Sequence, residues 1–410
     1  MRMRPRPPVG APLVALEKGL LHPNGSAPLS QLARGKKSAC VVICDITRPV
    51  PNKLLLPPIL RTIEEAGVPR ERLTVLIATG THRPNLGEEL EELVGAEIAS
   101  SYQVVNHRSG EAAEHVCLGT TSTGTEVWLD SRYVHSDLKV IVGFVEPHLM
   151  AGFSGGRKLI VPGIAGDKTM RVVHGAAMMA HPLCREGVIE GNPFHQEALE
   201  VAKKVGVDFS VNVALDEEKR LTGIFCGGLE QAHAAAVDFV RSVVTAELPA
   251  PADIVVTTSG GAPLDATFYQ AIKGVTAALP VVKQGGTIIL VGECREGLGS
   301  PHFTALCKET FDGEQFLRRI LESDYFVPDQ WQLQKYVQAL RTAEVLVVSP
   351  VLAQPENRCP LVKAFASFDE ALSEAMVREG AGAMMAVIPQ GPYVLPCVSG
   401  GTGDKGPQGN

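Results

Sequence analysis

Several features that would assign a protein to a class at once are scarce or missing in this chain of 410 residues. No apolar run approaches the roughly 20 residues that span a bilayer. The first residues, MRMRPRPPVG, carry arginines but lead into no apolar segment of the kind found in a secretory signal. The net charge is −7, whereas nucleic-acid and anionic-membrane partners favour a basic face. We therefore expect a soluble, cytoplasmic protein with neither partner.

Cysteine motifs and a dinucleotide-binding motif are missing as well. The nine cysteines are widely spaced and form no CxxC pair, so we interpret them as reduced packing residues rather than as metal ligands or disulfides. Gly401, Gly403 and Gly406 spell GxGxxG. They follow no predicted strand and open no helix, so they do not indicate a nucleotide site.

The patterns that are present predict an α/β fold with two doubly wound domains. Hydrophobic residues make up 45% of the chain and charged residues 20%, as in ordinary globular proteins. Helical patterns alternate with short β-branched runs. Asn192 and Pro193 mark a helix start, as N-cap and first helical residue, and a second helix is predicted over 232–243. The predicted buried strands are 40–44, 74–78, 138–142, 254–257, 287–291, 344–348 and 384–388.

A proline-containing segment, ELPAPAD at 247–253, is the best candidate for a linker between the domains. It separates a predicted helix from a fresh strand. We place an N-terminal domain at 1–250 and a C-terminal domain at 251–368, with the active site in the cleft between them. The strand within 369–398 is expected to return to the first domain, and the Gly-rich stretch 399–410 is expected to be a flexible tail.

Polar residues follow three predicted strands of the first domain. Asp45, Thr47 and Arg48 follow one strand, His82 follows the next, and His148 follows a third. Ligands of open α/β sheets bind beyond the carboxyl ends of the strands, and two facing histidines would form an acid/base pair. Taken singly, the Asp/Arg pair could be a surface ion pair and each histidine an ordinary loop residue.

A glycine-rich stretch over 150–166 holds a further candidate, Lys158. It differs from a P-loop, because Arg157 intervenes and Leu159 follows the lysine. Such a turn lets backbone N–H groups approach an anion, and a lysine in a partly apolar turn can become a nucleophile. The alternative is a glycine turn with a solvent-exposed lysine. His174 is also a candidate, although a lone histidine is more often a core residue.

These motifs resemble the lactate racemase family, whose members bind a nickel-pincer nucleotide. DITRPVPN, ATGTHRP, EPHLMAGFSGGRKLIVPGI, YQAIKG and DQWQLQ follow the family's order and spacing from about residue 10 to about residue 395. The resemblance implies a 2-hydroxy acid racemase or epimerase. It also implies that Lys158 is joined covalently to the cofactor, a nickel pyridinium-3,5-bisthiocarboxylic acid mononucleotide. His174 would then ligate Ni(II), a metal that imidazole suits.

The resemblance further implies roles for the other residues. His82 and His148 would be the acid/base pair, acting while hydride moves reversibly between substrate C2 and the cofactor. Asp45, Thr47 and Arg48 would line the cofactor and substrate, and Arg48 would also bind the substrate carboxylate. The second domain would contribute substrate contacts from Tyr269, Gln270, Lys273 and Trp331. Gln270 and Lys273 could instead form an exposed helix face.

Two other classes of protein are alternatives to a racemase. A nicotinamide-dependent 2-hydroxy acid dehydrogenase would need a glycine fingerprint after a strand. A non-catalytic, two-lobed carboxylate-binding protein would not need Lys158, His82, His148 and His174 together. The expected partners are therefore a small 2-hydroxy acid, such as lactate or malate, and the separate enzymes that make and load the cofactor.

Overall fold

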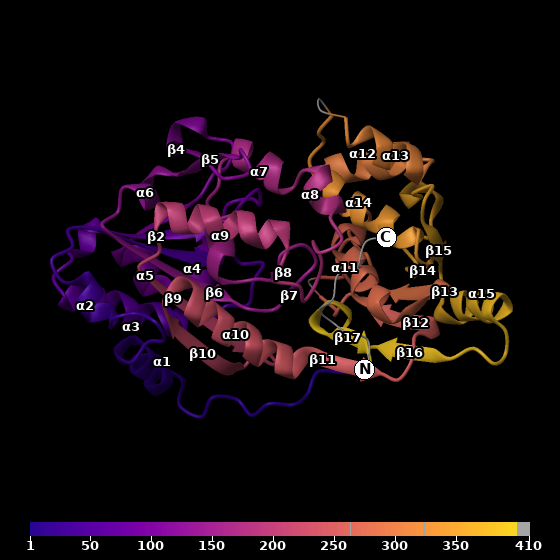
Figure 1. The fold of residues 1–410 in the computed structure, drawn as a ribbon, viewed down its shortest axis with the longest axis horizontal. Helices are drawn as coiled ribbons and strands as arrows, with labels where there is room; N and C mark the ends of the chain where they lie inside the picture. The colour runs from indigo at the N-terminus through magenta and orange to yellow at the C-terminus, as the bar shows by residue number, and fades with distance from the viewer. Residues whose placement is uncertain (263, 323–324, 400–410) are drawn as a thin grey trace.

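The computed structural model describes residues 1–262, 264–322 and 325–399, which form two α/β lobes (Figure 1). The sheet of the first lobe has the order β10-β9-β6-β1-β2-β3, with only β10 antiparallel to its neighbour. Its strands are β1 (Ala39–Cys44), β2 (Leu73–Ala78), β3 (Gln103–Asn106), β6 (Leu138–Phe144), β9 (Phe209–Leu215) and β10 (Leu221–Gly227).

Successive side chains of each strand point to opposite faces of this sheet, so a hydrophobic core forms on each face. In β1, Val41 and Ile43 pack into one cluster with the first helices of the chain, while Cys40 and Val42 pack into another with α7 and α9. The helices of the lobe are α1 (Pro12–Leu21), α2 (Leu29–Ala33), α3 (Asn52–Glu65), α4 (Glu88–Val94), α5 (Ala96–Ser101), α6 (Ser131–Val134), α7 (Asp167–Val173), α8 (Ala176–Ala180), α9 (Pro193–Val205) and α10 (Leu229–Val244). Two hairpins, β4 (His115–Thr120) with β5 (Glu126–Asp130) and β7 (Pro147–His148) with β8 (Gly152–Phe153), complete it.

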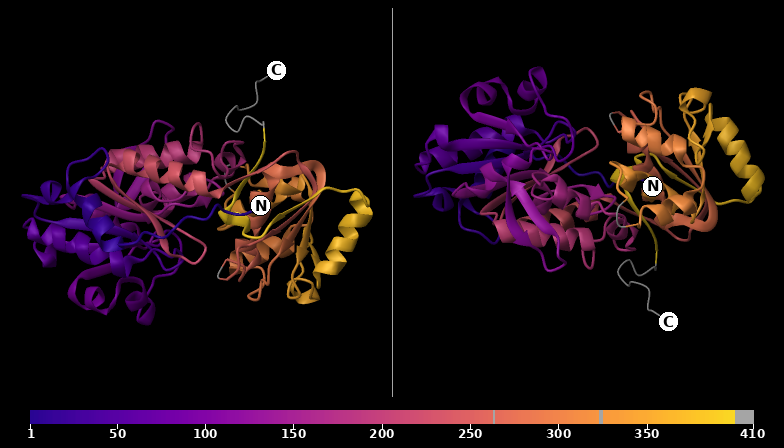
Figure 2. Two further views of the ribbon diagram at one scale, coloured as in Figure 1. Left: turned by 90° about the horizontal axis from the view of Figure 1, so that it is seen from below. Right: turned by 90° about the horizontal axis from the view of Figure 1, so that it is seen from above.

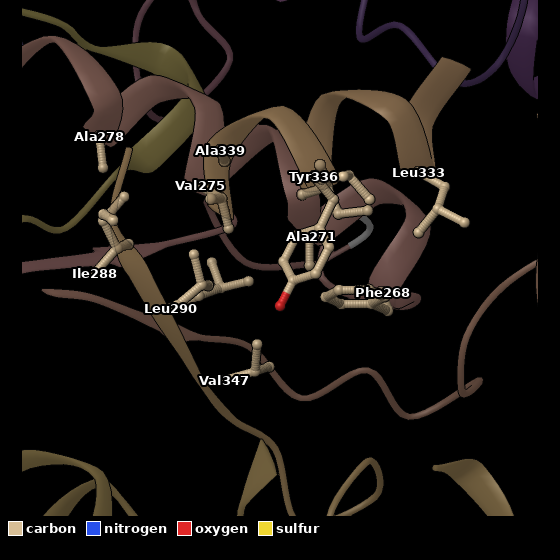
Figure 3. Close-up of a cluster of buried hydrophobic side chains, with 14 of the residues drawn as sticks. Phe268, Ala271, Val275, Ala278, Ile288, Leu290, Leu333, Tyr336, Ala339 and Val347 are labelled. Carbon is tan, nitrogen blue, oxygen red and sulfur yellow. The ribbon is translucent and has the colours of Figure 1, made fainter. Parts of the chain in front are cut away.

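The second lobe is a five-stranded parallel sheet with the order β15-β14-β13-β12-β16. Its strands are β12 (Ala252–Thr258), β13 (Val282–Val291), β14 (Glu344–Val348), β15 (Lys363–Phe365) and β16 (Met385–Ile388), and its helices are α11 (Phe268–Ala278), α12 (Pro301–Glu309), α13 (Gly313–Arg319), α14 (Gln330–Leu340) and α15 (Phe368–Glu379). Apolar side chains of α11 and α14 cover one face of this sheet, above Ile288, Leu290 and Val347 (Figure 3).

The doubly wound fold class is confirmed, and each predicted strand coincides with an observed one. Asn192 caps α9 as expected, because its side chain accepts the N–H of His195. The expectation that the strand within 369–398 returns to the first lobe is wrong, because that strand, β16, pairs in parallel with β12 of the second sheet. The last residues of the segment form β17 (Leu395–Val398), which pairs with β11 (Thr245–Leu248). A short apolar strand does not reveal its partner in its own sequence, which is why the error arose. Apart from Ser399, the expected tail lies outside the described residues, as does the GxGxxG stretch.

Two segments of the chain pass between the two lobes: the strand β11 and the N-terminal residues. β11 (Thr245–Leu248) leads into the second lobe and pairs in parallel with β17 (Leu395–Val398). The first residues also run from the second lobe to the first, as the two further views show (Figure 2). The amide of Arg4 donates to the Val243 carbonyl at 2.7 Å. All nine cysteines are free, and six of them are buried, whereas Cys117 is exposed and is not the packing residue that was predicted. Within the described ranges, no helix has both the length and the apolarity needed to cross a membrane.

Candidate active site

Three predicted side chains lie at the carboxyl ends of adjacent parallel strands. Asp45 follows β1, His82 follows β2 and His148 follows β6. Because β1 lies between β6 and β2, the two histidines flank Asp45. Neighbouring strands are about 4.8 Å apart, so the ends of β2 and β6 are separated by roughly 10 Å. Both histidines line the same cavity.

One cavity between the lobes brings all the predicted site residues together. It is lined from the first lobe by Asp45, Thr47, Arg48, His82, His148, Lys158 and His174, and from the second by Tyr269, Gln270, Lys273 and Trp331. The cavity is also lined by residues outside the predicted set, among them Cys44, Thr79, Thr81, Met170 and Gln332. Thr79 and Thr81 belong to the quoted motif ATGTHRP, so position after a strand would have found them.

Asp45 orients His82. Its Oδ2 lies 2.7 Å from His82 Nδ1, and its Oδ1 accepts the Thr47 hydroxyl at 2.5 Å. Burial alone would raise the pKa of Asp45, but the hydrogen bonds from His82 and Thr47 and the charge of Arg48 outweigh it and lower this pKa. An ionised Asp45 can only accept, so Nδ1 of His82 carries a proton and Nε2 keeps its lone pair. The ring is half exposed, at 48%, and can act as a base.

Arg48 and Lys273 bring two cations from opposite lobes to the cavity. Arg48 Nε lies 3.4 Å from Glu146 Oε1. Glu146 belongs to the motif EPHLMAGFSGGRKLIVPGI but is not one of the predicted site residues. Burial and the nearby Arg48 lower the pKa of Lys273 to about 7, although Glu146 opposes the shift. The pair therefore provides a site for a carboxylate.

The glycine-rich stretch makes a tight turn under the cavity. Gly155 and Gly156 have left-handed φ values of 73° and 51°, and a Cβ on Gly156 would lie 2.9 Å from the His233 ring. The N–H of Gly156 donates to Asn212 Oδ1 at 2.9 Å. Only glycine fits these two positions, and the turn leads into a short 3-10 helix (Gly156–Leu159) that presents Lys158 to the cavity.

The buried side chain of Arg157 stabilises this turn through hydrogen bonds to its backbone carbonyls. Its guanidinium is buried and donates to the carbonyls of Ala151 at 2.6 Å and Gly155 at 3.3 Å, and it lies 2.8 Å from His233 Nε2. Burial lowers the pKa of Arg157 to about 9. Among the described residues no carboxylate forms an ion pair with it, so its positive charge adds to that of Arg48 and Lys273 around the cavity.

Lys158 contacts His148. Its Nζ lies 2.7 Å from His148 Nε2, while His148 Nδ1 accepts the N–H groups of Met150 and Ala151 at 3.2 Å each. Burial, followed by the neighbouring cations, lowers the pKa of Lys158 well below its ordinary value. The pKa of His148 is lowered for the same reasons.

His174 ends α7 and lies between aromatic rings of both lobes. Its ring centroid is 4.7 Å from that of Trp331 and 5.7 Å from that of Phe194. Its Nδ1 lies 3.2 Å from the Met170 carbonyl oxygen, which can only accept, so Nε2 keeps the lone pair. Burial lowers the pKa of His174 to about 4. The described part of the chain gathers no group of three or more histidine, cysteine or carboxylate side chains that could hold a metal without further ligands.

Helices α11 and α14 complete the site and hold the segment beyond His174. Trp331 Nε1 donates to the Tyr269 hydroxyl at 3.0 Å, and Gln270 Oε1 is buried with no hydrogen-bond partner among the described residues. Gln334 donates to the Ala176 carbonyl at 2.8 Å. The buried Lys335 ammonium donates to the carbonyls of Met179 at 2.8 Å and Cys184 at 2.7 Å. A helix of the second lobe thus fixes the backbone of the first.

The chain matches known sequence families over both lobes. Residues 2–187 match the lactate racemase N-terminal domain and residues 248–395 match the lactate racemase C-terminal domain. The lactate racemase of Lactiplantibacillus plantarum is 37% identical over 384 residues, which are 93% of this chain and 90% of that protein. The lactate racemase of Thermoanaerobacterium thermosaccharolyticum is 36% identical over 336 residues, or 82% and 78% of the two chains.

Solved structures show the same fold. The lactate racemase apoprotein from Thermoanaerobacterium thermosaccharolyticum superposes with a TM-score of 0.90 at 33% identity, over 95% of this chain and 93% of that one. A protein from Thermotoga maritima superposes with a TM-score of 0.69 at 18% identity, over 94% and 98% of the two chains. The second likeness concerns the fold alone.

Proposed function

The chain belongs to the lactate racemase family, and from this membership we propose that it interconverts the enantiomers of a 2-hydroxy acid, lactate or a related acid such as malate. The observation that carries the proposal is a cavity lined by every candidate site residue that the resemblance supplied. The members of that set come from distant parts of the sequence and from both lobes. A carboxylate-binding protein would have no need of the lysine and three histidines.

The side chains suit the proposed cofactor. His174 donates Nδ1–H to a backbone carbonyl and so keeps Nε2 for a metal, an arrangement typical of metal-ligating histidines. Lys158 would be the covalent anchor. Arg48, Arg157 and Lys273 lower the pKa of Lys158, and Glu146 raises it. This excess of cations around Lys158 suits an anionic nucleotide. When bound, the nickel-pincer nucleotide would supply a reversible acceptor for the hydride on substrate C2.

The protein's own residues would bind the substrate and move its proton. Arg48 and Lys273 would hold the carboxylate, with Gln270 Oε1 available to accept a hydrogen bond from the hydroxyl or from water. His82, whose Nδ1 is held by Asp45, would take the hydroxyl proton of one enantiomer at Nε2. His148, on the other side of β1, would serve the opposite enantiomer. Inversion without net redox change requires two such groups, each a base in one direction and an acid in the reverse.

Co-expression with the cofactor-making enzymes tests the proposal. The denatured parent should carry the mass of the cofactor and the native protein should contain nickel, whereas Lys158→Ala should lack the adduct. Lys168→Ala is the matched control, because Lys168 is a nearby lysine whose side chain is 67% exposed. His174→Ala should keep the adduct but hold nickel less firmly. An adduct on the Lys158→Ala chain, or a loaded parent that leaves every enantiopure 2-hydroxy acid tested unchanged, would refute the proposal.

A further inference from the structure

The hydrogen bonds around His148 fix the position of its proton. The backbone N–H groups of Met150 and Ala151 both point at Nδ1, each at 3.2 Å. An amide N–H can only donate, so Nδ1 has to present its lone pair. A neutral imidazole has one ring proton, and here that proton is on Nε2.

The partner of that Nε2–H is Lys158 Nζ, 2.7 Å away. A lysine ammonium has three donors and no acceptor. At this distance an ammonium would place an N–H donor of Lys158 against the N–H donor of His148. A neutral amine has a lone pair and can accept. We propose that, before any cofactor is attached, Lys158 is a neutral amine that accepts a hydrogen bond from His148. His148 is thereby a positioning residue for a nucleophilic lysine in the cofactor-free protein. To act as a base after loading, its ring has to move the proton from Nε2 to Nδ1 and give up the amide hydrogen bonds of Met150 and Ala151.

The surroundings of Lys158 favour the same form. The largest charge effects on its pKa come from Arg48, Arg157 and, in its protonated form, Lys273, which all lower it, and from the carboxylate of Glu146, which raises it. The titratable His174 is neutral at pH 7, since burial lowers its pKa to about 4. Phe194 places its ring 6.0 Å from Nζ. A second ammonium among these cations, largely removed from water, would be unfavourable.

The chemical class of ligand follows from this arrangement. A neutral amine attacks an acyl or thioacyl carbon, and the surrounding cations attract an anion. The site is therefore suited to acylation of Lys158 by a negatively charged acyl or thioacyl compound. The inference deepens the proposed function by describing the lysine before loading, and it rests on that function only for the identity of the natural acyl donor.

Competitive acetylation of the cofactor-free protein tests the protonation state. With trace acetic anhydride, Nζ attacks a carbonyl carbon, acetate leaves and the amine proton passes to water. Peptide mass spectrometry across pH 5–11 gives a midpoint for each lysine. The exposed Lys53 provides the internal reference for labelling. We expect the Lys158 midpoint below about pH 7, more than about 3 pH units under the ordinary lysine pKa of about 10.4, which corresponds to about 1,000-fold more labelling at pH 7 relative to its own maximum. A Lys158 midpoint above that pH would overturn the proposal.

A matched pair of variants tests the part of His148. His148→Gln keeps an N–H donor, so Lys158 should stay reactive at neutral pH. His148→Glu is isosteric with that variant but offers a negative acceptor, which should stabilise the ammonium and raise the midpoint by about 1–3 pH units. Identical profiles for the parent and both variants would remove His148 from this role. If either variant is unfolded by circular dichroism, the profile of the parent still decides the state of the lysine.

The experiment also separates this inference from the proposed function. It needs neither the cofactor nor turnover. A lysine that labels as a neutral amine but never acquires the cofactor mass on co-expression would leave the inference standing and remove the proposed function. A lysine that labels as an ordinary ammonium but acquires the cofactor mass on co-expression would remove this inference and leave the proposed function standing.

Discussion

Asp45 and His82 are joined by a 2.7 Å hydrogen bond between Oδ2 and Nδ1. Asp45→Asn should disturb the tautomer of His82 and lower the rate of racemisation about 10²–10⁴-fold. Asp369→Asn is the matched control, because Asp369 is exposed in the first turn of α15 and does not line the cavity. Polarimetry on loaded protein measures both variants. Equal rates for Asp45→Asn and the parent would contradict the assignment.

The two histidines should be separable by half-reaction. His82→Ala and His148→Ala should each suppress complete inversion about 10²–10⁴-fold, because inversion uses both groups. Each variant, once loaded, should still react with one enantiomer in a single turnover, visible as a change in the absorbance of the cofactor. If both variants react with the same enantiomer, the two histidines do not serve opposite faces.

Lys273 should make substrate binding sensitive to pH. Its pKa of about 7, lowered by burial and Arg48, leaves it charged below pH 7 and neutral above. Attraction for the substrate carboxylate is thus lost as the pH rises through 7, and kcat/KM should fall up to about 10-fold per pH unit above that point. In Lys273→Arg the guanidinium stays charged, so this fall should be absent. A profile that is the same in both proteins would assign the titration to another group.

Asp130 should contribute to stability at neutral pH. Burial alone would raise its pKa, but hydrogen bonds from Arg132 and His107 lower it to about 2. A depressed carboxyl pKa stabilises the fold above the unfolded value of about 3.9, and the gain is lost as the pH falls towards 2. Asp130→Asn should therefore cost about 3–5 kcal/mol at pH 7, less at pH 3.

Urea unfolding of Asp130→Asn at both pH values measures this difference. Glu374→Gln is the control, because Glu374 pairs with Lys363 on the surface, where its side chain is 48% exposed. That substitution should cost less than about 1 kcal/mol. A cost for Asp130→Asn that does not change with pH would show that ionisation is not the cause.

Lys335 should fix the segment that follows His174. Lys335→Met leaves the carbonyls of Met179 and Cys184 without their donor, which should cost about 1–3 kcal/mol of stability. It should also weaken nickel retention by the loaded protein. The exposed Lys308 on α12 provides the control Lys308→Met. Unchanged stability and nickel content would show that the contact does not hold the segment.

The residues at strand ends could be predicted from the sequence, because parallel strands deliver their carboxyl ends to one edge. This rule located Asp45, His82 and His148. The contacts of α14 could not be predicted. Its polar residues Gln332, Gln334 and Lys335 are buried, although such side chains normally mark an exposed face. They are buried because they meet backbone carbonyls of α11 and the first lobe, and no periodicity in the sequence reports those partners.

The position of α14 also has a thermodynamic consequence. His174 belongs to one lobe, yet the backbone beyond it is held by Gln334 and Lys335 of the other. If His174 binds the metal as proposed, metal binding and association of the lobes are linked equilibria. Any change that tightens the association would then raise the affinity for the metal, and metal binding would strengthen the association by the same free energy. Loading should thus raise the melting temperature of both lobes together.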